Sequence, residues 1–463
     1  MDKEQKKRKQ TVRLILTETL MVIAVVIMVV ILLFIAMGYK VNLSSSNWGL
    51  EQSGLVQVDS IPTGAQVTID GDVLFYRTNM SKMLTEGEHD VILTKDGYEL
   101  WTGKISIKSG VLYKLDYPRL FLQDRITENV ADFDGGLEFL SASPNRNALL
   151  YQKKGDSGWQ IMNIGSDNVV INALDIRKLI RGEVTGFSNM LWNHSGEKVL
   201  VEYQNENYHD FVLIDTKKIE ASVNLTEKLG MNFSEIKFAS DSAERLIGLE
   251  NGNLRKITIG SEEVSSVLAS GVEEFGNNGM DIVYKNDKGE IGIYREGEKV
   301  NLIIGNMDEK NTKITVSEYL GNKYIGLAKD NEFYVYSGNN FPKKDLGDMN
   351  TVFHSTLEFV PEKAYIWSNG RFIILENGKN LAIFNAELNT ISQFSLENEH
   401  YNWLDGFLIG SVNDGNVVVR DFDGSNYRVL SPATDGYDSV ITENNKWLYY
   451  VSDDGKSLKR DQL

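Results

Sequence analysis

The sequence contains no cysteine, which excludes disulfides and every site that needs a thiolate. Proline is scarce, with 6 residues among 463, whereas glycine reaches 40. Small exported domains often depend on disulfides, so any exported domain of this chain must be held together by its buried core. Abundant glycine, little proline and 10% aromatic residues are typical of short strands joined by tight turns.

The sequence also lacks the motifs of common enzymes and metal sites. It has no G-x-S-x-G, no glycine-rich phosphate loop, no Walker motif and no HExxH. The five histidines are too widely spaced to suggest zinc. The turn 421–426 has aspartates at positions 1 and 3, but Gly424 and Pro432 stand where a calcium loop needs other residues, so we expect a turn that caps its own backbone. We predict no cofactor and no metal.

Positive charge is in the minority, with 48 Lys and Arg against 65 Asp and Glu, a net charge of −17. Nucleic acid and anionic lipid select clustered Lys and Arg, so we predict no nucleic-acid partner. In so acidic a chain, adjacent carboxylates such as Glu273-Glu274 arise by chance. Their side chains should diverge in a strand, so we do not interpret them as a glycosidase pair.

One long uncharged run, Leu20 to Tyr39, lies near the N-terminus and is about 30 Å long as a helix, enough to cross a bilayer. Six Lys and Arg residues lie within the first 13 positions, against two acidic residues. The positive-inside rule predicts a cytoplasmic tail (1–13), a retained signal anchor (14–39) and an extracytoplasmic remainder. A signal peptide cleaved at 36–38 is the alternative, although its apolar region would be shorter. Glu18 is expected at headgroup depth or against a partner helix.

Beyond the anchor, residues 40–54 are polar and serine-rich, and we predict a spacer. Apolar and polar residues then alternate through 55–117, for example in 65–69 and 105–107, and glycine turns separate the runs. Period-2 runs of about five residues between such turns predict a small antiparallel β-sandwich.

Three segments of this sandwich, 60–71, 84–91 and 95–98, resemble the signature of the PEGA domain. The resemblance implies a β-sandwich in an envelope-associated protein, an accessory module without known catalytic residues. Thr63 stands where the signature has Glu, and Thr78-Asn79 stands where Thr-Pro is common. The residues that carry the resemblance are Pro62, Gly64, Ala65, Asp70, Gly71, Gly87, His89, Gly97 and Tyr98.

The same residues have local structural roles. Pro62 fixes φ at the entry to a turn, Gly64 permits positive φ, and Asp70-Gly71 closes the next turn. His89 is expected to be a strand residue whose ring is satisfied by hydrogen bonds, because no second ligand lies at useful spacing.

The long C-terminal part, 118–463, is repetitive. Compact apolar strands recur about every 43 residues, which matches the ~40–45 residues of a four-stranded propeller blade. A second strand follows each of them, and we predict that the two are the inner and middle strands of a blade. The apolar strands are centred on Leu150, Leu200, Ile247, Val283, Ile325, Ile373, Leu408 and Tyr449.

Turns at 143–146, 193–197 and 421–426 resemble those of the TolB and WD40-like propellers. We predict an all-β chain with an N-terminal transmembrane helix, a PEGA-like sandwich and a β-propeller of eight blades, or seven if 301–314 hides a merged repeat. The last repeat ends too soon for a fourth strand. Because an open blade would expose unpaired edges, residues within 117–133 should supply that strand.

These features indicate a non-catalytic, membrane-anchored binding or scaffold protein of the cell envelope, with a protein or cell-wall glycan on the propeller. The alternative is an envelope hydrolase with its site in the propeller channel. Three or more carboxylates converging in a deep pocket would favour the hydrolase. A flat surface of aromatic and amide side chains would favour binding, including a platform for sugars.

Overall fold

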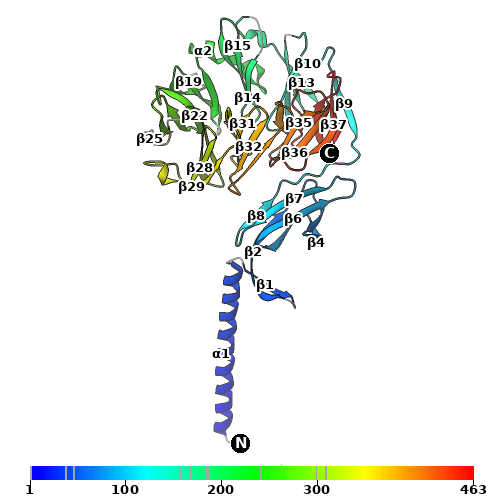
Figure 1. Cartoon of the computed structure of the whole chain (residues 1–463), viewed down its shortest axis with the longest axis vertical. Helices are drawn as coiled ribbons and strands as arrows, with labels where there is room; N and C mark the ends of the chain where they lie inside the picture. Colours follow the sequence, from blue (N-terminus) through cyan, green and yellow to red (C-terminus); the bar gives the residue numbers. More distant parts are fainter. Residues whose placement is uncertain are drawn as a thin grey trace. The chain divides into compact units, whose positions relative to one another are not determined.

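The computed structural model describes residues 3–36, 39–44, 47–156, 158–166, 169–182, 187–239, 242–261, 263–298, 300–307 and 310–463. The chain divides into two compact units, one ending at Asp124 and the other beginning at Arg125. The first contains a long helix and a β-sandwich, and the second is made of β-sheets (Figure 1). The predicted all-β class with an N-terminal helix is confirmed.

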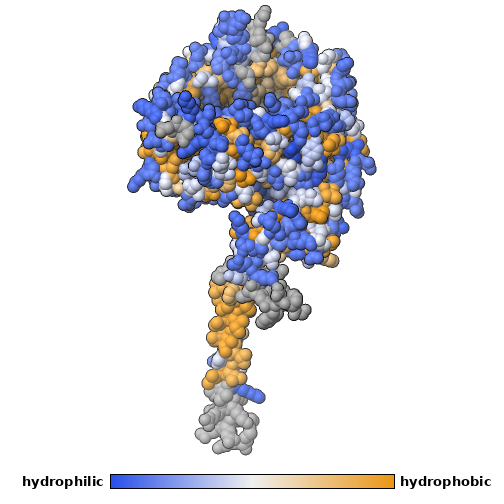
Figure 2. Space-filling model, viewed as in Figure 1, coloured by the Kyte–Doolittle hydropathy of each residue, from blue (hydrophilic) through white to orange (hydrophobic). Residues whose placement is uncertain are grey.

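Helix α1 (Lys3–Ala36) contains an apolar stretch, Arg13–Phe34, and is the one helix of the described residues long and apolar enough to cross a membrane. Large apolar side chains between Leu14 and Leu33 are exposed, and this part of the helix is largely orange in Figure 2. The hydroxyls of Thr17 and Thr19 donate to the carbonyls of Arg13 and Ile15, at 2.7 and 2.8 Å. These two polar groups are therefore satisfied within the helix.

The sandwich consists of two four-stranded sheets. One has the order β4 (Asp72–Arg77), β3 (Gln66–Ile69), β6 (Gly87–Thr94), β7 (Trp101–Ile107). The other contains β1 (Tyr39–Ser44), β2 (Asn47–Val58), β5 (Met80–Thr85) and β8 (Leu112–Leu115). Alternate residues of these strands face inward, and Val67, Val91, Leu93 and Trp101 are fully buried.

Three predictions about this unit need correction. The predicted spacer 40–54 contains strands β1 and β2, which pair from Tyr39↔Gln52 to Ser44↔Asn47. Its polar residues do not prevent a hairpin, because the ladder is made by backbone groups. The sandwich is not wholly antiparallel, since β8 runs parallel to β2.

The unit also extends past residue 117 to Asp124. The backbone of Ile61 accepts a hydrogen bond from Leu120 and donates one to Pro118, at 2.9 and 3.0 Å. Leu120 and Phe121 are buried. The extra segment is therefore held by the sandwich and is not part of the propeller.

The described residues of the second unit form eight four-stranded antiparallel sheets. In chain order, the first four are β10 (Leu137–Ala142), β11 (Ala148–Lys153), β12 (Trp159–Asn163), β13 (Val170–Leu174); β14 (Phe187–Trp192), β15 (Lys198–Gln204), β16 (His209–Asp215), β17 (Val223–Asn224); β18 (Glu235–Ala239), β19 (Ser242–Glu250), β20 (Asn253–Thr258), β21 (Glu263–Val264); and β22 (Val272–Asn278), β23 (Asp281–Asn286), β24 (Glu290–Arg295), β25 (Val300–Asn306).

The last four sheets follow the same plan. They are β26 (Thr312–Tyr319), β27 (Asn322–Lys329), β28 (Glu332–Gly338), β29 (Asn350–Thr356); β30 (Lys363–Trp367), β31 (Phe372–Asn377), β32 (Asn380–Asn385), β33 (Thr390–Ser395); β34 (Tyr401–Trp403), β35 (Leu408–Asn413), β36 (Asn416–Asp421), β37 (Arg428–Pro432); and β38 (Val440–Ile441), β39 (Trp447–Val451), β40 (Ser457–Gln462), β9 (Thr127–Asp132). Short helices α2 (Leu225–Leu229), η1 (Ile176–Lys178), η2 (Ile219–Ala221) and η3 (Leu346–Asp348) lie in the connections.

The sheets form a β-propeller, as predicted. The first strands of neighbouring sheets, such as β22, β26 and β30, contact each other and are therefore the inner strands. Every recurring strand found in the sequence is the second strand of its sheet, and the strand after it is the third. The predicted hairpin is therefore the middle pair of a blade, not the inner and middle strands. The region 301–314 holds parts of β25 and β26.

The ring is closed by a strand from before the first sheet, which confirms the prediction for 117–133. Strand β9 pairs with β40 from Thr127↔Asp461 to Asp132↔Ser457. Figure 1 shows β9 in cyan beside the red end of the chain. Phe133 and Tyr151 share a core with Tyr449, so the first and last sheets also pack against each other.

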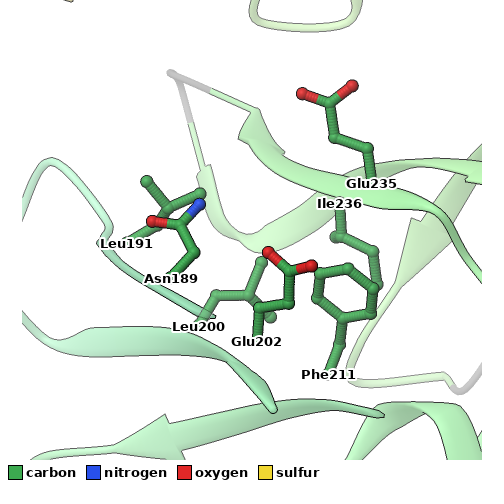
Figure 3. Close-up of a pocket in the computed structure, with 7 residues that line it drawn as sticks. All are labelled: Asn189, Leu191, Leu200, Glu202, Phe211, Glu235 and Ile236. Atoms are coloured by element: carbon green, nitrogen blue, oxygen red, sulfur yellow. The ribbon is translucent and has the colours of Figure 1, made fainter. Parts of the chain in front are cut away.

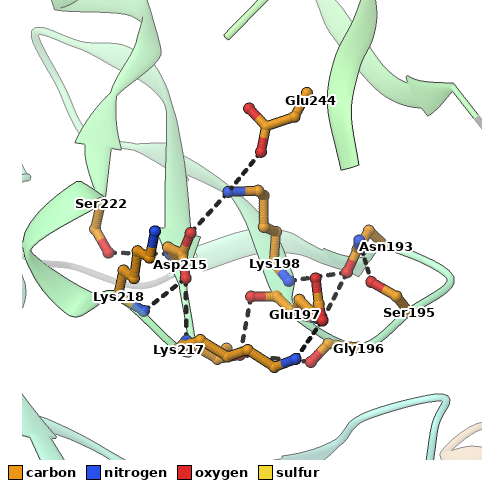
Figure 4. Close-up of polar contacts among 11 residues, drawn as sticks. Asn193, Ser195, Gly196, Glu197, Lys198, Asp215, Lys217, Lys218, Ser222 and Glu244 are labelled. Atoms are coloured by element: carbon orange, nitrogen blue, oxygen red, sulfur yellow. Dashed lines mark hydrogen bonds and ion pairs between the residues drawn. The ribbon is translucent and has the colours of Figure 1, made fainter. Parts of the chain in front are cut away.

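The turn at 193–197 fixes the second sheet (Figure 4). Oδ1 of Asn193 accepts from the backbone N–H groups of Glu197 and Lys198, at 2.9 and 2.8 Å. The buried ammonium of Lys198 then lies 2.7 Å from Asp215 Oδ2 and 3.3 Å from Glu244 Oε1 on the third sheet. Burial alone would lower the pKa of Lys198, but these carboxylates raise it. The turn thus joins two strands and the neighbouring sheet.

The turn at 421–426 caps its own backbone, as predicted. The carboxylate of Asp421 accepts from Asn426 Nδ2 at 2.9 Å, and Asp423 Oδ1 accepts from the backbone N–H of Ser425 at 2.9 Å. The turn at 143–146 behaves similarly, with Ser143 Oγ accepting from the N–H of Ala148 at 2.9 Å.

Candidate functional site

The residues that carry the PEGA resemblance lie around three turns of the sandwich. At the first turn, Gly64 (φ +83°) and buried Ala65 are tied to Thr78: the carbonyl of Thr78 accepts from Gly64 at 2.8 Å, and its Oγ1 accepts from the N–H of Ala65 at 2.9 Å. The carbonyl of Pro62 accepts from Ser60 Oγ at 2.8 Å. This cluster holds the entry into β3.

At the second turn, Asp70 and Gly71 both have positive φ, and Asp70 reaches His89 on β6. His89 Nδ1 lies 2.6 Å from Asp70 Oδ2, and Nε2 lies 2.8 Å from the carbonyl of Thr85. The ring is therefore satisfied, as predicted. The hydrogen bond to His89 lowers the pKa of Asp70. Burial opposes protonation of His89, but the bonds to Asp70 and Thr85 outweigh it and raise the pKa of that ring above 6.5.

This ion pair should make the stability of the sandwich depend on pH. The lowered pKa of Asp70 means that its contribution is present above pH 3.8 and is lost as pH falls through the folded value. The raised pKa of His89 means that its contribution is complete below pH 6.5 and is lost as pH rises through the folded value. We expect a fragment of residues 39–124 to resist urea best between these limits.

The test is a series of urea titrations between pH 4 and pH 9. His89 is the sole histidine of this fragment, so His89→Gln should abolish the loss of stability above pH 6.5. An unchanged loss in the variant would show that another group is responsible.

The remaining motif residues hold the exit of the sandwich. Gly87 (φ +134°) is the first residue of β6, and Gly97 (φ +81°) precedes Tyr98. The carbonyl of Gly97 accepts from Gln123 at 3.0 Å, and Tyr98 forms an isolated bridge with Leu122. The structure therefore places the motif residues at separate turns and does not bring them together in one site.

Gly64 offers a direct test of the first turn. A Cβ there would have space, with Lys95 Nζ at 3.8 Å as its nearest neighbour, but φ is +83°. Gly64→Val should therefore destabilise the sandwich by about 1–3 kcal/mol through backbone strain alone. The measurement is the urea midpoint of the same fragment. Thr63→Val, at the exposed neighbouring position, should change the free energy of unfolding by no more than about 0.5 kcal/mol. If both variants lost the same stability, the loss would come from the size of the valine side chain and not from backbone strain at Gly64.

The propeller contains a charged pocket of about 520 Å³ at the beginnings of three consecutive inner strands. Inner strands of successive antiparallel sheets run in the same direction, so their first residues meet on one face of the ring. The pocket combines three carboxylates and three ammonium groups with polar and small apolar neighbours. It is lined by Glu273, Glu274, Lys285, Lys310, Asn311, Thr312, Lys313, Val360, Pro361, Glu362 and Asn377.

Two of its carboxylates form ion pairs. Glu273 Oε2 lies 3.0 Å from the buried ammonium of Lys285 on β23, and Glu274 Oε2 lies 3.2 Å from Lys313 on β26. A β-bulge between Val272 and Glu274 interrupts the register of β22 and β23. Bulges re-aim side chains, and both glutamates line one pocket although they are adjacent in the strand. The sequence-based expectation that their side chains diverge is therefore only half right: their partners differ, but their pocket is shared.

Glu274 is a largely buried carboxylate of the pocket. Burial raises the pKa of its carboxyl and outweighs the lowering by Lys237 and Lys313. Lys237 belongs to β18 of the third sheet and pairs with Glu235 of the same strand at 3.0 Å. It also donates to the carbonyl of Phe275 on β22 of the fourth sheet at 2.7 Å. Charges of alternating sign thus continue from the pocket toward the third sheet.

A second, much smaller cavity of about 40 Å³ lies between the second and third sheets. Figure 3 shows its lining, in which Asn189, Glu202 and Glu235 supply the polar groups and Leu191, Leu200, Phe211 and Ile236 the apolar ones. Its volume suits ordered water and excludes a larger ligand. Within the described ranges, no group of three or more His, Asp or Glu side chains could hold a metal ion.

The lysines and Glu362 of the pocket were missed from the sequence. The signal was present in the repeats: charged residues stand at the start of the inner strand in successive repeats, as Glu274, Lys313 and Lys363 do. Without the register of the strands, these positions could not be aligned, and the pairing of residues from different sheets remained invisible.

Comparison with known proteins identifies one part of the chain. A family model of the PEGA domain matches residues 53–119. Residues 53–119 form a PEGA domain. The resemblance read from the motif is confirmed, and the match includes part of the segment predicted as a spacer. Comparison with curated proteins gives no match.

Several solved structures are similar to the chain. The Cps50 (Swd1) β-propeller domain of Myceliophteria thermophila has 10% identity and a TM-score of 0.40, covering 73% of this chain and all of that domain. The computationally designed Ika8 protein has 11% identity and a TM-score of 0.42, with coverage of 72% and 98%. An oligogalacturonate lyase in complex with manganese has 12% identity and a TM-score of 0.40, again with 72% and 98%.

Proposed function

We propose that this chain is a non-catalytic, single-pass membrane protein of the cell envelope, whose propeller binds a protein or cell-wall glycan. In this proposal α1 is a retained anchor, its basic N-terminal end is cytoplasmic, and the PEGA domain and propeller are extracytoplasmic. The length and apolar surface of α1 and the positive-inside rule support the topology. The PEGA domain supports an accessory role of the sandwich.

The observation that carries the binding role is the charged pocket. Its volume lies in the usual range for small ligands, and residues from three sheets line it. Glu273 and Glu274 each contact a lysine, so they are held in place as parts of a recognition surface. Charge complementarity of this kind provides specificity.

The alternative, an envelope hydrolase, is favoured by one observation. Glu274 has a raised pKa, as a general acid requires, and Glu273 and Glu362 line the same pocket. Three carboxylates in one pocket satisfy part of the criterion stated for the hydrolase. The lysines at 3.0 and 3.2 Å from two of them argue against it, because a nearby ammonium favours the charged carboxylate over the acid.

Two experiments test the proposal. Protease added outside intact cells should digest the PEGA domain and propeller, whereas their protection would overturn the topology. The purified full chain in detergent micelles should cosediment with isolated cell-wall sacculi or crosslink to an envelope protein, without releasing soluble sugar or peptide. Release that is lost in Glu274→Gln would establish the hydrolase instead.

A further inference from the structure

Two charged residues of the pocket remain without an ion pair among the residues that the structure describes. Lys310 lies just before β26, and Glu362 lies just before β30; both are exposed. The other charged groups of the pocket are occupied, since Glu273 contacts Lys285 and Glu274 contacts Lys313. The pocket therefore presents one free cation and one free anion on neighbouring sheets, within the described part of the chain.

We infer that the pocket binds a short peptide segment that carries both a carboxylate and an ammonium group. Lys310 receives the carboxylate and Glu362 receives the ammonium. Asn311 and Asn377 supply amide groups for the peptide backbone, and Val360 lines the pocket with apolar surface. This inference deepens the proposed function and rests on it.

The charges of the chain and of the pocket favour such a zwitterion over a ligand of one sign. The net charge of −17 repels an anion at long range, while Lys310, the one lysine of the pocket without an ion pair among the described residues, opposes a purely cationic ligand at short range. A zwitterion avoids both penalties. None of the described residues lining the pocket is aromatic, so it lacks the stacking platform that sugar rings prefer.

The test uses the full chain in detergent micelles and a synthetic peptide, acetyl-Ala-Glu-Ala-Lys-Ala-amide, titrated by calorimetry. Versions with Gln for Glu or Met for Lys carry one charge only. Each should bind about fivefold more weakly, the effect of one exposed ion pair of about 1 kcal/mol. Lys310→Met and Glu362→Gln should weaken the zwitterionic peptide by a similar factor.

The charge exchange Lys310→Glu with Glu362→Lys should restore much of the binding, because the peptide can enter in the opposite direction. Lys178→Met and Glu263→Gln, at exposed positions elsewhere on the propeller, should leave the affinity unchanged. Equal affinity of the wild type, Lys310→Met and Glu362→Gln would overturn the inference.

Cosedimentation with sacculi distinguishes the source of the peptide, and it separates a failure of this inference from a failure of the proposed function. If sacculi no longer bind the chain after an amidase has removed their peptides, the bound segment belongs to the wall polymer. If the synthetic peptide binds but sacculi do not, the bound segment belongs to a protein. Sacculus binding without any peptide binding would overturn this inference and leave the proposed function standing, whereas the absence of every envelope ligand would overturn both.

Discussion

Replacing Asp461 with alanine should lower the free energy of unfolding of the propeller by about 3–5 kcal/mol, because the carboxylate is fully buried where the ring closes. Its Oδ1 accepts from Thr127 Oγ1 at 2.7 Å and Tyr450 Oη at 2.9 Å. Its Oδ2 accepts from Ser431 Oγ and lies 4.0 Å from Arg125 Nε. The substitution deprives all of these groups of one common partner.

These contacts join three parts of the ring. Thr127 lies on the closing strand β9, Tyr450 on β39 of the eighth sheet, and Ser431 on β37 of the seventh. A closed ring stabilises every sheet through its neighbours, so weakening one junction should lower the stability of the whole propeller. The measurement is the urea concentration at the midpoint of unfolding of the second unit. The slope of the unfolding free energy against urea concentration should be the same in wild type and variant, so that a shift in the midpoint reports stability.

The control is Glu128→Ala on the closing strand β9, which pairs with the strand of Asp461. Glu128 is exposed and pairs with Arg460 at 2.6 Å, and an ion pair of this kind contributes at most about 1 kcal/mol. Asp461→Asn keeps the size of the side chain and should cost less than alanine. If Asp461→Ala and Glu128→Ala had equal effects, the buried carboxylate would not hold the junction.

The closing strand could be predicted because an unpaired sheet edge is unfavourable, and a stretch ahead of the first repeat was free to pair with the last sheet, as β9 does with β40. The second strands could be predicted for a different reason. Each is buried on both faces between neighbouring sheets, as β15 is at Val199, Leu200 and Val201, so it appears in the sequence as a continuous apolar run.

The inner strands carry a weaker signal, because they mix buried residues with exposed and charged ones, as the burial of β22 shows. The inner strand β22 contains Glu273 and Glu274, and its bulge depends on pairing with β23. The charged pocket depends further on which sheets are neighbours and how their inner strands align. None of these relations follows from local periodicity, which explains why the fold was predicted and the pocket was not.

The PEGA domain shows the same division between local and non-local information. Its turns were predicted because glycine at positive φ leaves a signature in sequence. The parallel pairing of β2 with β8 joins Leu55 to Leu112 and Val58 to Leu115, residues far apart in the chain. Alternation determines which face of each strand is buried, but it does not determine which strand lies beside it.

The second large effect is expected at Gly370, in the turn between β30 and β31. A Cβ there would lie 2.2 Å from the carbonyl oxygen of Glu318 on the neighbouring sheet, and φ is +86°. Gly370→Ala should therefore lower the free energy of unfolding by about 2–5 kcal/mol, because left-handed strain is added to a clash with backbone that cannot rotate away.

Gly321 is the matched control: it has φ +79° in the corresponding turn of the fifth sheet, but nothing lies within 4 Å of its Cβ position. Gly321→Ala should cost only the strain, about 1–2 kcal/mol. The difference between the two urea midpoints thus measures how closely the fifth and sixth sheets approach, and equal losses would mean that this approach contributes nothing.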